Sequence, residues 1–182
     1  MKSTSNGTDP PWETLSSEKI YENPWYGLRQ DLVRTHTGKQ ITYTYMEHPG
    51  AVAVVPVTPD GKIVLIKSYR YTVKDWCWEI PMGGRDHADL EVVARKELQE
   101  EIGGICRKIE YINYFYANNG VSDIRCDVFL AREVEIGANE PEEAELIEIE
   151  VLIKDEVYRM AYAGEITDGM SALSLFLCEK HL

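Results

Sequence analysis

Three glutamates lie close together in a segment whose pattern predicts a helix. In the stretch ARKELQEEIGG they are Glu97, Glu100 and Glu101, at spacings of three and four residues. Residues with these spacings are neighbours on one side of a helix, where like charges destabilise by about 0.2–0.5 kcal/mol per pair. Such a cluster is either solvated or placed to bind something positively charged.

The apolar residues of this segment indicate which way the carboxylates point. At about 100° per residue they occupy one arc of the helical wheel, formed by Leu90, Val93, Ala94, Leu98 and Ile102. Glu97 and Glu101 fall inside this arc and Glu100 lies near its edge. The opposite side carries Arg95, Lys96 and Gln99. Two carboxylates therefore face inward, which is the reverse of a solvated charged face.

An inward carboxylate has to be protonated, paired with an arginine or bound to a cation, because its burial alone costs several kcal/mol. Carboxylate oxygens suit Mg²⁺, whose remaining coordination positions are filled by water and substrate phosphates. We therefore interpret the cluster as a Mg²⁺ site beside a bound phosphate.

Composition excludes several other classes of protein. The 182-residue chain has a formal net charge of −12 and no basic stripe, which argues against binding nucleic acid through its phosphates. The longest apolar run, AVAVVPV, is far shorter than the roughly 18 residues of a membrane span. Residues 1–11 lack the apolar core of a signal peptide and are predicted to be a disordered lead-in. Four cysteines without C-x-x-C spacing indicate reduced thiols and a cytoplasmic protein.

Hydrophobic patterns predict the elements that position the glutamates. Short strands are expected in residues 12–50, followed by a hairpin that turns at Asp60-Gly61. An extended segment ends at Pro81, a Gly83-Gly84 loop follows, and a helix runs from about Asp89 to Ile102. Later strands are predicted in YINYFYA, RCDVFLA and LIEIEVLI, an acidic loop between Glu133 and Glu145, and helices in KDEVYRMAYAG and SALSLFLCEKHL. This order favours a mixed sheet with helices packed against it.

The segment KELQEEIGG resembles the core of the Nudix box, G-x5-E-x7-R-E-U-x-E-E-x-G-U, in which U is a bulky apolar residue. The segments DGKIVLIKSYRY, WEIPMGG, YFYANNGVSDIRCDVFLA and AGEITDGMSALSLFL are similar to those of ADP-ribose pyrophosphatases and related nucleoside-diphosphate-sugar hydrolases. The resemblance runs from about Trp12 to the C-terminus. It implies an α/β class Nudix fold, an α/β/α sandwich with a mixed β-sheet, in residues 49–182. It also implies a small N-terminal antiparallel β-sheet in residues 12–48 that joins two subunits of a homodimer.

The box departs from the family pattern in its loop. Counting back from Glu97, the first glycine and the isolated glutamate of the box fall on Met82 and Ala88. Lys96 replaces the box arginine, and Gly104 replaces the final apolar residue. Because E-x-x-E-E is intact, we interpret these changes as a variant loop that is one residue shorter than usual, followed by a helix that keeps its function.

The resemblance implies roles for the acidic residues. Glu97 and Glu101 are the principal metal ligands, Glu100 joins one ion directly or through water, and the backbone carbonyl of Met82 also coordinates. The expected ion is Mg²⁺, with Mn²⁺ as the alternative. The proton acceptor of the hydrolysis is expected on the late acidic loop, at Glu143 or Glu145, although either is also consistent with a solvated surface position.

Further residues are assigned to the substrate by the same resemblance. Arg70 binds phosphate or is a surface arginine at a strand end, and Glu79 contacts the substrate or holds the loop. Trp25 and Tyr43 either sandwich the adenine or pack in the core. Asn119 stands where the family commonly has proline, which makes the loop polar.

The predicted function is Mg²⁺-dependent hydrolysis of ADP-ribose and related nucleoside diphosphate sugars, giving a nucleoside monophosphate and a sugar phosphate. The alternative is a catalytically silent Nudix-fold sensor of a nucleotide sugar. Ala88 and Lys96 favour the sensor, whereas the intact glutamates favour the enzyme.

Overall fold

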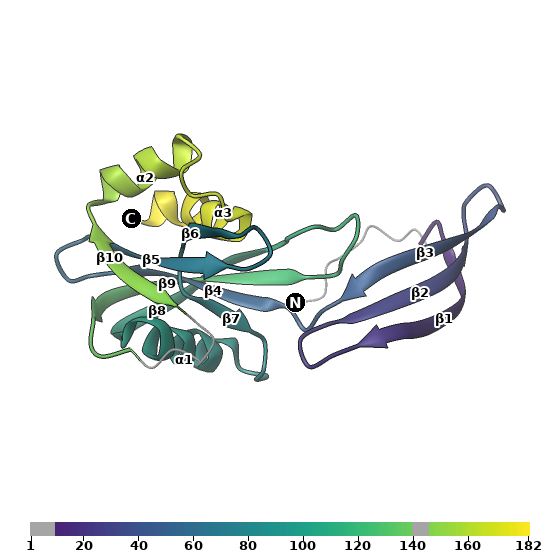
Figure 1. Cartoon of the computed structure of the whole chain (residues 1–182), viewed down its shortest axis with the longest axis horizontal. Coiled ribbons are helices and arrows are strands. Elements are labelled where there is room, and N and C mark those ends of the chain that lie inside the picture. Colours follow the sequence, from purple (N-terminus) through teal and green to yellow (C-terminus); the bar gives the residue numbers. More distant parts are fainter. Residues whose placement is uncertain (1–9, 140–145) are drawn as a thin grey trace. The chain divides into compact units, whose positions relative to one another are not determined.

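The computed structural model describes residues 10–139 and 146–182 (Figure 1). Its contacts divide the chain into two compact units. One contains the residues up to His48 together with Asn118–Ile124, and the other contains Pro49–Ala117 and Arg125–Leu182. The loop that carries Asn119 is thus grouped with the N-terminal residues. None of the helices in the described part of the chain is long and apolar enough to span a membrane.

The first unit is built on an antiparallel sheet, ordered β1-β2-β3. Its strands are β1 (Glu13–Glu22), β2 (Gly27–Arg34) and β3 (Gln40–Glu47). The β2–β3 turn contains Gly38 at a φ of 83°, a left-handed conformation that favours glycine. In the β1–β2 turn, the Asn23 side chain accepts hydrogen bonds from the backbone N–H groups of Trp25 and Tyr26. The predicted small antiparallel sheet is confirmed.

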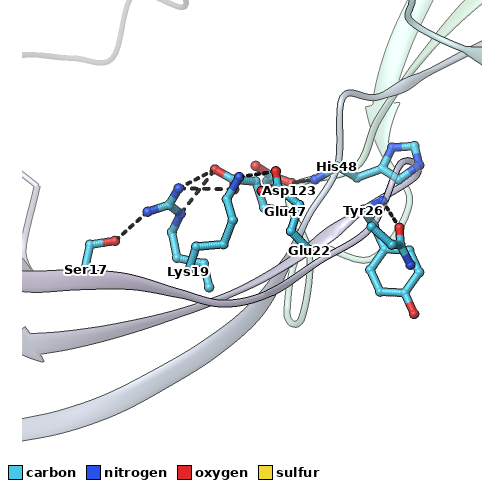
Figure 2. A network of polar contacts seen from close by, with 9 residues as sticks. Ser17, Lys19, Glu22, Tyr26, Glu47, His48 and Asp123 are labelled. Carbon is cyan, nitrogen blue, oxygen red and sulfur yellow. Dashed lines mark hydrogen bonds and ion pairs between the residues drawn. The ribbon is translucent and has the colours of Figure 1, made fainter.

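Charged side chains connect the three strands of this sheet (Figure 2). Arg29 on β2 donates to both carboxylate oxygens of Glu47 on β3 and to the Ser17 hydroxyl on β1. Lys19 contacts Glu22 and Glu47. The hydrogen bonds from Arg29 lower the pKa of Glu47, so this carboxylate stays ionised at neutral pH. The network thus links the three strands of a sheet with few buried apolar residues.

The second unit contains a seven-stranded mixed sheet with the central order β10-β5-β4-β9-β8. Strand β6 pairs with β5, β7 pairs with β4, and the β4–β9 pairing is parallel. The strands are β4 (Ala51–Val57), β5 (Ile63–Arg70), β6 (Asp75–Glu79), β7 (Met82–Gly84), β8 (Ile105–Tyr116), β9 (Arg125–Glu135) and β10 (Ile147–Leu152). The helices are α1 (Leu90–Ile102), α2 (Lys154–Tyr162), α3 (Gly169–Cys178) and the short η1 (Glu179–His181).

Alternating residues of β4 build two cores. Val52 and Val54 pack with α1, whereas Ala53 and Val55 pack with the cluster that contains α2 and α3. Figure 1 shows α1 on one face of the sheet and α2 and α3 on the other. Because both faces are covered, β4 reads as a continuous apolar run. The predicted α/β/α sandwich is confirmed.

Two loop predictions are wrong in part. Met82–Gly84 is a short strand because Met82, Gly83 and Gly84 pair with Ala53, Val52 and Ala51 of β4. The acidic loop begins later than predicted, since β9 continues to Glu135 in its pairing with β8. The first correction matters for the site, because pairing with the central strand holds β7 in place.

Candidate active site

Helix α1 has defined ends because both of them are capped. The Asp89 side chain accepts a hydrogen bond from the Glu91 backbone N–H at the N-terminus. At the C-terminus Gly103 adopts a φ of 61°, and the N–H groups of Gly103 and Gly104 donate to carbonyls of the last turn. The predicted helix is confirmed, and the buried Val93, Ala94, Leu98 and Ile102 fix which of its sides faces the core.

Glu97 and Glu101 point inward, as the helical wheel predicts. Their exposed fractions are 7% and 4%, comparable to the fully buried Leu98 and Ile102 on the same helix. Glu100 is partly exposed, with 39% of its side chain accessible. Two carboxylates are therefore held in the interior, where an uncompensated charge is costly.

Strand β7 lies directly against these two carboxylates. The backbone N–H of Met82 donates to Oε2 of Glu101 at 3.1 Å. A Cβ atom added to Gly83 would lie 2.1 Å from Cδ of Glu97, so the missing side chain of Gly83 is the space that this carboxylate fills. The glycine needed by the box helix is therefore Gly83. Counting back from Glu97 at the family spacing gives position 82 for this glycine. The count is off by one because it assumes a box loop of the usual length, whereas this loop is one residue shorter.

Lys96 connects the helix to the box loop. Its Nζ lies 2.9 Å from Oδ2 of Asp86 and 3.5 Å from Oε2 of Glu100. The hydrogen bond between Lys96 and Asp86 raises the pKa of the lysine and lowers that of the aspartate. Ala88 cannot supply a loop carboxylate, and Asp86 is the residue that meets the helix instead. Sequence reasoning missed Asp86, although an acidic residue in the same loop was the available signal.

The carboxylate oxygens of Glu97 and Glu101 fit a hard divalent cation, which prefers oxygen ligands. Within residues 10–139 and 146–182, however, no three histidine, cysteine, aspartate or glutamate side chains are grouped so that they could hold a metal ion. Glu100 is paired with Lys96 on the partly exposed side of the helix. The structure thus brings two of the three predicted carboxylates together against β7.

Arg70 and Glu79 form a bidentate ion pair across the β5–β6 hairpin. Arg70 donates from Nε to Oε1 at 2.8 Å and from Nη2 to Oε2 at 2.5 Å. Glu79 is buried, with an exposed fraction of 4%, whereas 46% of the Arg70 side chain is accessible. Arg70 is therefore more than a surface arginine at a strand end, because it compensates a buried carboxylate.

The remaining predicted substrate residues belong to the first unit. Trp25 has an exposed fraction of 71%, which contradicts the alternative that it packs in the core. Tyr43 packs edge-on against Trp12 with ring centroids 6.1 Å apart, and its hydroxyl donates to the Gly120 carbonyl at 2.7 Å. This bond ties β3 to the exposed loop that carries Asn119. The two candidate bases, Glu143 and Glu145, lie outside the described residues.

Comparisons with known proteins agree with the fold. Residues 12–46 match the model of the nucleoside diphosphate sugar hydrolase N-terminal domain, and residues 47–169 match that of the NUDIX domain. The chain is 30% identical to an ADP-ribose pyrophosphatase of Bacillus subtilis, with 90% of each chain covered. It is 29% identical to a methanol dehydrogenase activator of Bacillus methanolicus, again over 90% of each chain.

A third relative, an ADP-ribose pyrophosphatase of Mycobacterium tuberculosis, is 34% identical over 74% of this chain and 68% of its own. Among solved structures, an ADP compounds hydrolase superposes with a TM-score of 0.83 over 96% of both chains, and at 16% identity it supports the fold. The chain belongs to the Nudix family and is a Nudix pyrophosphohydrolase.

Proposed function

We propose that the protein hydrolyses the diphosphate bond of ADP-ribose and related nucleoside diphosphate sugars, giving a nucleoside monophosphate and a sugar phosphate. The observation that carries this proposal is the pair of buried carboxylates on α1, Glu97 and Glu101, held against the backbone of β7. The names of the Bacillus subtilis and Mycobacterium tuberculosis relatives support ADP-ribose as one substrate.

Glu97, Glu101 and the Met82 carbonyl would hold Mg²⁺ or Mn²⁺, with Glu100 joining after it leaves Lys96. When bound, such an ion supplies positive charge at the diphosphate and lowers the pKa of the attacking water. Glu143 or Glu145 accepts the proton of that water in this proposal. The residues of α1 and β7 act by holding their oxygen atoms in fixed positions before substrate arrives.

Other side chains would bind and orient the substrate. The guanidinium of Arg70, kept in place by Glu79, presents its accessible side to a phosphate oxygen. Trp25 and Tyr43 would offer flat aromatic faces for the base, and Asn119 would add a polar group beside the substrate. Stacking does not depend on base identity, so several nucleoside diphosphate sugars are expected to be accepted.

The test is a coupled assay in which a phosphatase releases inorganic phosphate from the two products but not from the intact substrate. ADP-ribose, ADP-glucose, GDP-mannose, UDP-glucose and dinucleotides are compared with Mg²⁺ and with a chelator. Phosphate release that requires Mg²⁺ and disappears in a folded Glu97→Gln variant supports the proposal. Absence of release from every compound contradicts it.

A nucleotide-sugar sensor is the second candidate, and the contact between Lys96 and Glu100 favours it because it occupies one of the three predicted ligands. A sensor predicts that ADP-ribose raises the melting temperature without being consumed. The enzyme predicts turnover under the same conditions.

We also infer a cytoplasmic homodimer formed through residues 12–48. Exposed apolar side chains in this segment support it, and they are Trp12, Ile20, Tyr21 and Leu32. A symmetric interface would bury such residues in both copies. Light scattering at micromolar concentration tests this assembly, and a monomer would contradict it.

A further inference from the structure

A second cluster of charges lies at the start of β9. Asp127 is completely buried, and its Oδ1 accepts hydrogen bonds from Nε and Nη2 of Arg125 at 3.1 and 2.5 Å. The hydroxyl of Tyr111 donates to the same oxygen at 3.2 Å. The guanidinium of Arg125 also lies 4.0 Å from the ring centre of Tyr114. Asp127 and Arg125 therefore form an ion pair through Oδ1, with the Arg125 guanidinium stacked on the ring of Tyr114.

Arg85 adds a second cation, beside the other oxygen of the Asp127 carboxylate. Its Nη1 lies 3.5 Å from Oδ2 of Asp127, which is an ion-pair contact but not a hydrogen bond. Oδ2 is buried and has no hydrogen-bond partner among the described residues. Two arginines thus surround one carboxylate, which leaves the cluster with a net charge of +1 in a chain of net charge −12.

The backbone is shaped to hold Arg85 in this position. Gly50 has a φ of 105°, and a Cβ atom there would lie 2.6 Å from Cδ of Arg85. The Arg85 N–H also donates to the Gly50 carbonyl at 3.2 Å. The aliphatic part of the Arg85 side chain therefore packs against the backbone of Gly50, while 31% of the side chain remains accessible. A guanidinium carries five N–H donors, and one contact to Asp127 leaves several of them available to a ligand.

The sheet places this cluster on the same face as the buried glutamates. Val52 of β4 is paired with Gly83 of β7 on one side and with Asp127 of β9 on the other. Val52 packs with α1, and residues directly opposite on neighbouring strands share a face. Two strand spacings separate Gly83 from Asp127, a distance of about 10 Å. The substrate of the proposed reaction is anionic along its whole diphosphate.

We propose that Arg85 and Arg125 form a phosphate-binding subsite, and that Asp127 holds the two guanidinium groups in place through its ion pairs with them. The phosphate is either part of the diphosphate that is hydrolysed or an additional phosphate on the substrate. In both cases the planar guanidinium groups donate to its oxygens, the geometry for which arginine is suited. The inference depends on the proposed function only for the identity of the substrate, because a phosphate site can be tested without turnover.

The first experiment measures binding of inorganic pyrophosphate by calorimetry in the presence of a chelator. The variant is Arg85→Gln, which leaves the Asp127–Arg125 pair intact and is expected to fold. The matched control is Arg107→Gln, since Arg107 is an exposed arginine of the same sheet whose guanidinium lies 3.5 Å from Glu133. We expect pyrophosphate to bind about tenfold more weakly to the Arg85 variant, and the control to bind as the wild type does.

The second experiment compares KM for ADP-ribose and for ADP-ribose 2′-phosphate. If the subsite binds the hydrolysed diphosphate, Arg85→Gln raises both KM values by about tenfold. If it binds an additional phosphate, the wild type prefers the 2′-phosphate and the variant loses that preference.

Unchanged pyrophosphate binding in a folded Arg85→Gln protein overturns the subsite, as does an equal loss in the Arg107 control. A lower melting temperature with unchanged binding and unchanged KM values shows a structural ion pair and also overturns it. A wild type that binds pyrophosphate through Arg85 but hydrolyses nothing contradicts the proposed function while the subsite stands.

Discussion

Replacing Gly83 by alanine tests whether the carboxylate of Glu97 acts where the structure places it. A Cβ atom at Gly83 would lie 2.2 and 2.3 Å from the two carboxylate oxygens of Glu97. Gly83 does not have a positive φ, so alanine is compatible with the backbone. The change therefore acts on the glutamate and leaves the strand itself unstrained.

The size of the effect follows from this overlap. Ordinary contacts of a Cβ atom begin at 3.4 Å, so the Glu97 carboxylate has to retreat by about 1 Å. A misplacement of about 1 Å in a reacting arrangement costs roughly 100-fold in rate, equivalent to about 2.7 kcal/mol of transition-state stabilisation. The free energy of unfolding should change by only about 1 kcal/mol, because the end of a flexible side chain is displaced.

The assay is kcat/KM for ADP-ribose with Mg²⁺, accompanied by urea unfolding and by Mn²⁺ binding followed by electron paramagnetic resonance. Gly84→Ala is the matched control, since a Cβ atom at the neighbouring glycine meets nothing within 4 Å. We expect Gly84→Ala to behave as wild type, and Gly83→Ala to lose activity and Mn²⁺ affinity together. Full activity and Mn²⁺ affinity in a folded Gly83→Ala protein would refute the role of Glu97.

Three further predictions concern Glu101, the Arg70–Glu79 ion pair and two buried cysteines. Glu101→Gln should lower kcat at least about 100-fold because a charged ligand is lost. Its melting temperature, measured by circular dichroism, should stay near that of the wild type because the amide oxygen still accepts the β7 backbone N–H. Normal turnover would exclude Glu101 as a ligand. Arg70→Ala should lower the free energy of unfolding, measured in urea, by roughly 1–3 kcal/mol because it leaves the buried Glu79 without its partner. Adding Glu79→Gln to this variant should recover part of that loss. Additive effects of the two substitutions would show that the two residues do not interact. Burial raises the pKa of the Cys126 and Cys178 thiols to about 12. Mass spectrometry should therefore find neither cysteine alkylated by iodoacetamide at pH 8 until denaturant is added. Labelling of either cysteine in the native protein would contradict their burial.

The sequence by itself determined the helix and the direction of its carboxylates. Helical periodicity is a local property, so the apolar arc from Leu90 to Ile102 fixed which side of α1 is buried, and Glu97 and Glu101 share that side. The stop at Gly103 was also readable, because a left-handed cap favours glycine. The motifs around the helix were specific enough to indicate the family, which the family models confirm.

The tertiary structure decided what these carboxylates meet. Nothing local in Met82–Gly84 predicts a strand, because its partner β4 lies about 30 residues earlier and the pairing depends on the whole sheet. The same holds for the ion pairs Lys96–Asp86, Arg70–Glu79 and Arg85–Asp127, because in each of them the two residues lie outside any common helix or strand. Spacing rules give the neighbours of a residue along its own helix or strand, whereas contacts between elements depend on how the chain folds back on itself.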